Sequence, residues 1–244
     1  MKNKKSKICI ATVTWARNLS EKKIILKTLK MLSELGYPIV VADERNAATP
    51  LTADLKKIKN VKVFTASGFD KKAKLSLSRA AAISDYIFWI EADKFEFAKN
   101  HAKNFINHYL KNPCGTLLPG RSASSFFQYP KFQQTLEKFL FYITAELLSK
   151  PLLDVCYGPR IFPSVLVEFL SHLKRDIGFG FQAYLLAINS RLNLPVNQIN
   201  YKISPPPDIQ SANVIKLYRL QQAQDWIEGL NQGLGVNKNL INCC

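Results

Sequence analysis

The sequence has no long hydrophobic run and few acidic residues. No stretch approaches the roughly 18 consecutive apolar residues that a membrane-spanning helix needs, so a membrane-spanning protein is not expected. Asp and Glu number 18 against 34 Lys and Arg, which gives a net charge of +16. Such an excess of positive charge predicts attraction to polyanions, among them nucleotides, nucleic acid and an anionic membrane face.

Cysteine is scarce, and its spacing does not match that of a metal site. The five cysteines are Cys9, Cys114, Cys156, Cys243 and Cys244. Because they are scattered along the chain, we interpret these as reduced thiols of a cytoplasmic protein. Apolar residues make up 47% of the 244 residues and charged residues 21%, which is typical of a globular chain and excludes a disordered one.

The most informative stretch runs from Tyr86 to Lys94. Its first five residues are aromatic or β-branched without alternation, which favours a strand covered on both faces, as in a parallel sheet. Glu91 and Asp93 then follow where the strand ends. Ligands of open α/β sheets bind outside the carboxyl ends of the strands, and paired carboxylates there suit Mg²⁺ or Mn²⁺. The alternative is a strand end with two solvated acids.

Predicted strands and helices alternate along most of the chain. The expected strands are 8–14, 37–42, 61–65, 86–90, 116–118 and 196–203. The expected helices are 20–35, 52–59, 75–83, 95–110, 132–148, 164–173, 181–191 and 215–230. This alternation predicts right-handed βαβ units, and therefore an α/β fold with a mostly parallel sheet flanked by helices. We expect one domain over 1–204 and a C-terminal helical tail over 205–244, packed on or beside it.

Seven segments, in order, carry a resemblance to a known family. They are residues 8–18, 39–44, 71–82, 87–93, 119–121, 154–160, and 178–182 followed by 194–201. Together they resemble the glycosyltransferases of the GT-A fold, family 2, nearest the polyprenyl-phosphate sugar synthases. The resemblance implies a Rossmann-like GT-A sheet and transfer of a sugar from a nucleotide-sugar donor. It covers roughly residues 7–202 and departs from the family pattern at Glu91, where an Asp is usual.

The resemblance implies a divalent metal, Mg²⁺ or Mn²⁺, bound to Glu91 and Asp93. His172 is the candidate third ligand, as a His is in some members, although a lone His on a helix is more often a surface or core residue. The metal would act as a Lewis acid on the donor diphosphate. Because Glu is one methylene longer than Asp, a catalytically degenerate binding protein of the same fold is the alternative.

The donor nucleotide has its own candidate residues. Asp43, at the end of the second strand, can accept hydrogen bonds from the base or ribose, and the first strand near Thr12 and Thr14 can supply backbone partners. Positive charge for the diphosphate is expected from Lys71, Lys72 and Arg79. Arg79 is expected at a helix start, which faces ligands in this kind of sheet. A solvated loop is the alternative for the lysines.

Arg121, Asp154 and Arg160 are the candidate catalytic residues on the acceptor side. Either arginine can grip an anionic acceptor through two parallel hydrogen bonds, or it can form a structural ion pair. Asp154 is expected to orient the acceptor or act as a base, and a turn cap is the alternative. The acceptor itself is expected to be a small molecule or a polyprenyl-phosphate-like lipid.

The partners of the chain follow from its surface charge. Helix 132–148 is the most apolar, and part of it can form an exposed patch for a partner or a lipid, so peripheral membrane contact is expected beside a cytoplasmic location. Nucleic acid is disfavoured, because the basic residues are spread over every segment without a concentrated arm. A nucleotidyltransferase is disfavoured as well, since no glycine-rich loop follows the first strand.

Overall fold

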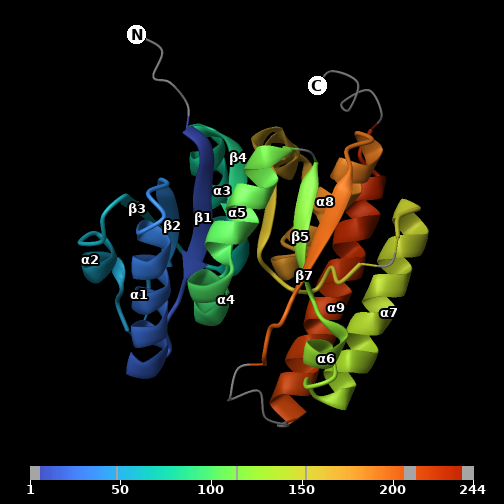
Figure 1. Cartoon of the computed structure of the whole chain (residues 1–244), viewed down its shortest axis with the longest axis horizontal. Coiled ribbons are helices and arrows are strands. Elements are labelled where there is room, and N and C mark those ends of the chain that lie inside the picture. Colours follow the sequence, from blue (N-terminus) through green and yellow to red (C-terminus); the bar gives the residue numbers. More distant parts are fainter. Residues whose placement is uncertain (1–5, 48, 114, 152, 206–212, 238–244) are drawn as a thin grey trace. The chain divides into compact units, whose positions relative to one another are not determined.

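The computed structural model describes residues 6–47, 49–113, 115–151, 153–205 and 213–237 (Figure 1). The chain divides into two compact units. The first runs to Pro113 and includes Gly158–Glu168, and the second comprises Cys114–Tyr157 and the chain from Phe169 onward. Cys114, Cys243 and Cys244 lie outside the described residues, as does most of the linker expected after residue 204.

The first unit alternates strands with helices. Its elements are β1 (Ser6–Thr14), α1 (Leu19–Ser33), β2 (Ile39–Glu44), α2 (Thr52–Leu55), β3 (Val61–Ala66), α3 (Phe69–Ala81), β4 (Ser84–Trp89), α4 (Phe95–Asn100), α5 (Ala102–Lys111) and β6 (Arg160–Pro163). The helix η1 (Ser164–His172), which is a 3₁₀ helix, follows β6. In Figure 1, α1, α4 and α5 lie in front of this sheet and α3 lies behind it.

The sheet of this unit has the order β3-β2-β1-β4-β6. β1 pairs in parallel with β2 and with β4, and β2 pairs in parallel with β3, while β6 runs antiparallel to β4. The chain moves outward from β1 to β3 and then returns to the other side of β1. The connections that leave β1 and β4 therefore diverge, and this switch point is where α/β sheets bind ligands.

The central strands consist of unbroken apolar runs because both of their faces are buried. Ile8–Ala11 in β1 is completely buried on both faces, as expected for a central strand covered by helices. On β4, the ring of Phe88 packs at a centroid distance of 5.8 Å from Phe105 and 6.5 Å from Phe97. This aromatic cluster anchors α4 and α5 to the centre of the sheet, and it fixes the position of the turn that carries Glu91 and Asp93.

The second unit combines a strand pair with helices. Its elements are β5 (Thr116–Arg121), α6 (Ala123–Phe126), α7 (Lys131–Leu148), the 3₁₀ helix η2 (Gly178–Gly180), α8 (Phe181–Arg191), β7 (Val196–Tyr201) and α9 (Asn213–Leu234). β5 and β7 pair in parallel. The core is formed by apolar side chains of α7, α8 and α9, among them Leu140, Phe141, Leu186, Trp226 and Leu230.

Close backbone approach holds α9 in this unit. A Cβ added at Gly229 would lie 2.0 Å from the carbonyl oxygen of Gly180, so only glycine allows the two segments to approach this closely. The indole Nε1 of Trp226 donates a hydrogen bond to Thr144 Oγ1 at 3.0 Å, which ties α9 to α7. The C-terminal helix is thus packed into the second unit. The expected domain boundary at residue 204 stays a prediction.

The expected fold class is confirmed, and several expected boundaries are wrong. The first helix begins after Asn18, whose side chain accepts a hydrogen bond from Glu21 N, instead of after Ser20. Helix α3 begins at Phe69, six residues before the expected start at Leu75, because Gly68 adopts a φ of 86° and opens it. The expected helix over 95–110 is two helices, with a break at His101.

Among the helices of the described ranges, none combines the length and the apolar character that crossing a bilayer requires.

Candidate functional site

Polar side chains of the first unit gather at the carboxyl edge of its parallel strands. Thr14 ends β1 and lies opposite Asp43 of β2, while Glu44 lies opposite Ala66 of β3. The registers bring these residues level because parallel strands end at the same edge. The edge therefore collects two carboxylates and a hydroxyl beside the N-terminus of α3.

Asp43 is the buried anchor of this edge. Its Oδ1 accepts a hydrogen bond from Thr14 Oγ1 at 2.7 Å, and its Oδ2 accepts one from Thr52 Oγ1 at 2.7 Å. The residue is only 1% exposed, so it joins β1, β2 and the start of α2 from within the protein. Thr12 is also buried, and its hydroxyl donates to the carbonyl of Val13 at 3.3 Å.

Lys72 and Glu44 form a second, largely buried contact at the same edge. Lys72 Nζ lies 2.9 Å from Glu44 Oε2 and donates a hydrogen bond to the carbonyl of Thr14 at 3.2 Å. Glu44 Oε2 also accepts from Gly68 N at 3.2 Å. Burial alone would raise the pKa of Glu44, but the hydrogen bonds from Lys72 and Gly68 lower it below its ordinary value. Glu44 was not among the expected site residues, although it adjoins Asp43.

The expected position of Arg79 is wrong. Because α3 begins at Phe69, Arg79 lies in the last turn of the helix, about 15 Å along its axis from the first turn. Its guanidinium carbon stacks 5.1 Å from the ring centroid of Phe64. The first turn carries Lys71 and Lys72 instead, and of these Lys71 is exposed. Positive charge at the helix start therefore comes from the lysines.

Glu91 and Asp93 occupy different environments. The Glu91 carboxylate lies directly against the backbone of Gly158, where an added Cβ would be 2.0 Å from Oε2. Its Oε1 accepts a hydrogen bond from the indole of Trp89 at 3.3 Å. The Asp93 side chain is 65% exposed, and Lys94 Nζ lies 3.3 Å from its carboxylate. Asp93 therefore offers a hard oxygen ligand to solvent, whereas Glu91 is held against the strand pair β4–β6.

Side chains alone form no complete metal site within the described ranges, because no three His, Cys, Asp or Glu side chains there lie together as a metal would require. His172 belongs to the second unit, where its ring packs 6.4 Å from that of Phe169, and Glu91 and Asp93 belong to the first. The expected three-residue ligand set stays a prediction. A divalent ion that takes water and phosphate oxygens needs fewer side chains.

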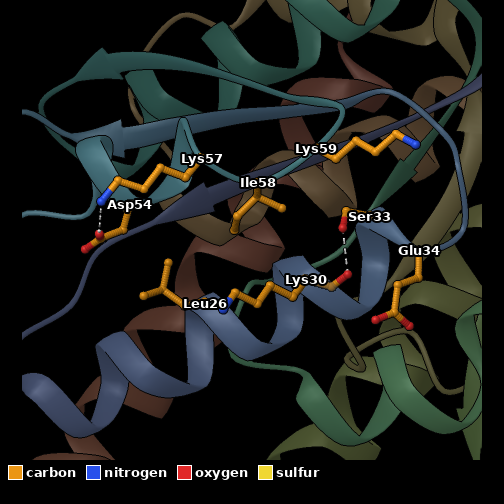
Figure 2. A pocket seen from close by; sticks show the side chains of 8 residues that line it. All are labelled: Leu26, Lys30, Ser33, Glu34, Asp54, Lys57, Ile58 and Lys59. Carbon is orange, nitrogen blue, oxygen red and sulfur yellow. Dashed lines mark hydrogen bonds and ion pairs between the residues drawn. The ribbon is translucent and has the colours of Figure 1, made fainter.

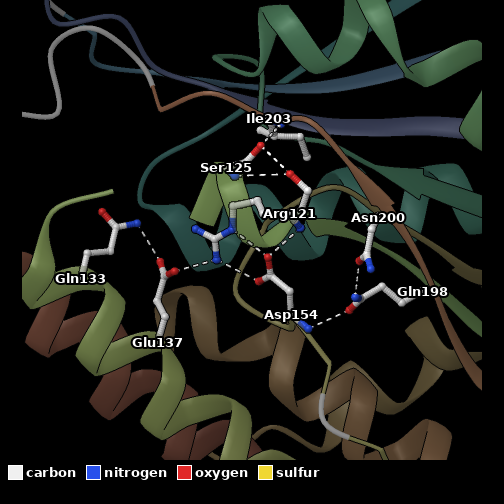
Figure 3. A network of polar contacts seen from close by, with 9 residues as sticks. Arg121, Ser125, Gln133, Glu137, Asp154, Gln198, Asn200 and Ile203 are labelled. Atoms are coloured by element: carbon white, nitrogen blue, oxygen red, sulfur yellow. Dashed lines mark hydrogen bonds and ion pairs between the residues drawn. The ribbon is translucent and has the colours of Figure 1, made fainter. Parts of the chain in front are cut away.

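Arg121 and Asp154 form a buried ion pair in the second unit (Figure 3). Arg121 Nε lies 2.7 Å from Asp154 Oδ2, and Nη2 lies 2.8 Å from Oδ1 of the same carboxylate. Nη2 also reaches Glu137 Oε2 at 2.6 Å. The Arg121 side chain is 1% exposed. Burial alone would lower the pKa of Arg121, but the Asp154 hydrogen bond and the charges of both carboxylates raise it.

Further side chains complete this network. Gln133 donates to Glu137 Oε1 at 2.7 Å, and Gln198 Oε1 accepts from Asp154 N at 2.7 Å. The Arg121 guanidinium also stacks on Tyr129 at 4.7 Å. Of the two alternatives for Arg121, the structural ion pair is the one observed. Asp154 also accepts a hydrogen bond from the backbone N–H of Arg121 at 2.9 Å. Both residues are buried, and their expected roles toward an acceptor stay predictions.

Arg160 is buried in the first unit. It is 1% exposed, and its Nε donates a hydrogen bond to the carbonyl of Gly158 at 3.1 Å. Its backbone pairs with Trp89 across β4 and β6. Arg160 thus supports the backbone on which Glu91 rests, and its expected contact with an acceptor stays a prediction.

One surface cavity lies away from the strand ends (Figure 2). It measures about 470 Å³ and lies between the second half of α1 and the segment that links α2 to β3. Its lining residues are Leu26, Lys30, Ser33, Glu34, Asp54, Lys57, Ile58 and Lys59. Asp54 is already paired with Lys22 at 2.8 Å. The cavity shares none of the residues at the carboxyl edge, so it forms no part of the candidate site.

The Arg121 network predicts a large effect on stability. We expect Arg121→Met to lower the free energy of unfolding by about 3–5 kcal/mol, because two buried carboxylates lose their cation. Urea unfolding measures this loss. Arg79→Met, at an exposed arginine, should cost less than about 1 kcal/mol.

A triple variant tests the cause of that loss. Adding Glu137→Gln and Asp154→Asn to Arg121→Met removes the unpaired charges and should restore part of the lost stability. A loss below about 1 kcal/mol in Arg121→Met would show that the buried pair does not hold the second unit together.

The fold resembles that of solved structures, although the sequence matches no family model and no curated protein. The structure is similar to glucosyl-3-phosphoglycerate synthase from Mycobacterium tuberculosis in complex with Mn²⁺, UDP and glucosyl-3-phosphoglycerate. The TM-score is 0.65 at 13% identity, over 95% of this chain and 81% of that one.

Two further structures support the same fold. The same enzyme in complex with Mn²⁺, UDP-glucose and phosphoglyceric acid gives a TM-score of 0.66 at 13% identity, over 95% of this chain and 80% of that one. Rv0371C from Mycobacterium tuberculosis, in complex with manganese, gives 0.52 at 13% identity, over 89% and 99%. A likeness to the polyprenyl-phosphate sugar synthases in particular is not confirmed. What the comparisons show is the fold, and it is the GT-A fold.

Proposed function

We propose that the chain is a glycosyltransferase that moves a sugar from a nucleotide-sugar donor to a small-molecule or lipid-linked acceptor, with the help of Mg²⁺ or Mn²⁺. One observation carries the proposal. At the switch point of the first unit, an exposed carboxylate, Asp93, follows β4, while the Asp43 and Lys72–Glu44 contacts hold the ends of β1 and β2. A diphosphate donor needs this combination of a metal ligand, a rigid strand edge and a helix N-terminus.

The buried residues of the edge shape the donor site. Asp43 fixes the end of β1 through Thr14, and each of its oxygens can still accept a further hydrogen bond. Lys72 neutralises Glu44 and holds the carbonyl of Thr14, so the backbone around the first turn of α3 keeps one geometry. Lys71, which is exposed in the same turn, supplies the cation for a diphosphate.

The donor set at β4 fits a hard divalent cation. Asp93 would hold the metal, with phosphate and water oxygens completing the shell. When bound, such an ion supplies Lewis-acid stabilisation of the departing diphosphate. Lys94 Nζ lies 3.3 Å from the Asp93 carboxylate and pairs with it in the free protein. Glu91 positions the turn through its contacts with Trp89 and Gly158.

The comparisons and the charge support the choice of ligands. The similar glucosyl-3-phosphoglycerate synthase was solved with Mn²⁺, UDP-glucose and phosphoglyceric acid. We take a uridine nucleotide as the first donor to test, and a small anionic acceptor as the first acceptor. The net charge of +16 favours both, because it draws anions toward the protein.

A second candidate is a binding protein of the same fold without catalysis. The contact that favours it is the packing of the Glu91 carboxylate on Gly158, which turns the first residue of the Glu-Ala-Asp motif toward the protein. Such a protein would bind nucleotides weakly and without any metal effect. The two candidates therefore differ in one measurable quantity, the change in nucleotide affinity on adding metal.

Asp93→Ala tests the metal ligand. Calorimetric titration with UDP should show binding that Mn²⁺ strengthens by about tenfold or more in the wild type, which corresponds to at least 1.4 kcal/mol. The variant should lose this strengthening because it lacks the exposed carboxylate. Asp85→Ala is the matched control, since Asp85 is also exposed but lies at the opposite end of β4. An undiminished Mn²⁺ effect in Asp93→Ala would remove Asp93 from the site.

Glu91→Asp separates the enzyme from the binding protein. Shortening this side chain by one methylene withdraws its carboxylate from Trp89 and Gly158 and moves the turn that carries Asp93. Displacement of about 1 Å can cost on the order of a hundredfold in rate, so the enzyme should lose metal-dependent UDP affinity or activity. Equally weak, metal-independent binding by the wild type and the variant would instead support the binding protein.

A further inference from the structure

One side of α7 exposes a row of large apolar side chains. Phe132, Phe139 and Tyr142 are spaced by seven and three residues, which puts them on one side of the helix. Phe127 lies just before the helix, and Leu147 lies in its last turn. These five residues, between 37% and 64% exposed, form what we name the α7 face: Phe127, Phe132, Phe139, Tyr142 and Leu147.

The core of the second unit does not need this face. The opposite side of α7 is buried through Leu140, Phe141 and Leu148, which pack in the cluster that includes Trp226. Thr144 on that side accepts the hydrogen bond from the Trp226 indole. The helix is therefore anchored by its inner side. Exposing several aromatic rings in one row is unfavourable in water, and such rows mark interaction surfaces.

Positive charge borders the α7 face. Lys131 and Lys138 are exposed, and Lys138 Nζ lies 5.2 Å from the ring centroid of Phe127. Glu137 is buried against Arg121, so its charge is neutralised within the protein. Glu146 is the remaining acid of this helix. Over the described residues of α7, the exposed charges thus favour anions.

We propose that the α7 face docks on an anionic lipid surface. Aromatic side chains suit the boundary between headgroups and acyl chains, and lysines beside them attract anionic headgroups. The charge of +16 adds long-range attraction to such a surface. The proposal does not rest on the transferase function.

Vesicle flotation tests the proposal. The wild type should bind phosphatidylcholine vesicles that contain about 25% phosphatidylserine, bind pure phosphatidylcholine weakly, and dissociate between about 50 and 500 mM NaCl. Lys131→Gln with Lys138→Gln should weaken binding by about thirtyfold, at about 1 kcal/mol per lysine. Phe139→Gln with Tyr142→Gln should weaken it by about tenfold or more.

Two double variants in the first unit serve as controls, one for the loss of positive charge and one for the loss of exposed apolar side chains. Lys99→Gln with Lys103→Gln removes two exposed lysines of α4 and α5, and Leu19→Gln with Ile24→Gln removes two exposed apolar side chains of α1. Both control pairs should bind vesicles within about twofold of the wild type. The far-ultraviolet circular dichroism spectrum and the urea unfolding midpoint of all four pairs should match those of the wild type, which shows that each variant is folded.

Three outcomes would overturn the proposal. The first is no binding of the wild type to anionic vesicles at low salt. The second is equal weakening by the control pairs, which would show attraction through net charge without a docking face. The third is a wild-type dimer, seen by analytical ultracentrifugation, that Phe139→Gln with Tyr142→Gln dissociates, which would make the face a contact between copies of the chain.

Discussion

The parallel register around β1 is the constraint on which the candidate site depends. Thr14 lies opposite Asp43 because β1 and β2 pair in parallel, and Ala11 lies opposite Trp89 because β1 and β4 do the same. A shift of one residue in either pair would turn Thr14 away from Asp43 or move the turn at Glu91 and Asp93. The buried apolar segment Ile8–Ala11 of β1 holds both registers, so apolar packing determines where the polar chemistry lies.

Buried charges have different roles in the two units. In the first, Lys72 and Glu44 form an ion pair at the edge of the sheet, where a charged ligand can interact with either side chain. In the second, Arg121 is enclosed by Asp154, Glu137 and aromatic rings, and the pair is part of the packing. An arginine whose donors are already used inside the protein cannot bind a substrate without breaking the fold around it.

The sequence predicted the strand edges well and the side-chain partners poorly. Strand ends could be found because apolar runs stop at carboxylates, as they do at Asp43 and Glu91. The start of α3 was missed because its first turn is as polar as a loop, and only the backbone angle of Gly68 reveals it.

Contacts between distant residues were hidden from the sequence altogether. Arg121 and Asp154 are 33 residues apart, and nothing in either segment shows that the two side chains meet. Glu91 rests on Gly158 through the antiparallel pairing of β4 with β6, which an alternating α/β pattern does not predict.

The most direct test of the proposed function is release of the nucleotide from a panel of nucleotide sugars, followed by mass spectrometry. With Mn²⁺ and small anionic acceptors present, the wild type should release a nucleoside diphosphate from at least one donor and form a glycosylated product. Chelation of the metal should abolish release, because the diphosphate then leaves without charge stabilisation. Release that persists without metal, or no release from any donor while the protein stays folded, would contradict the account.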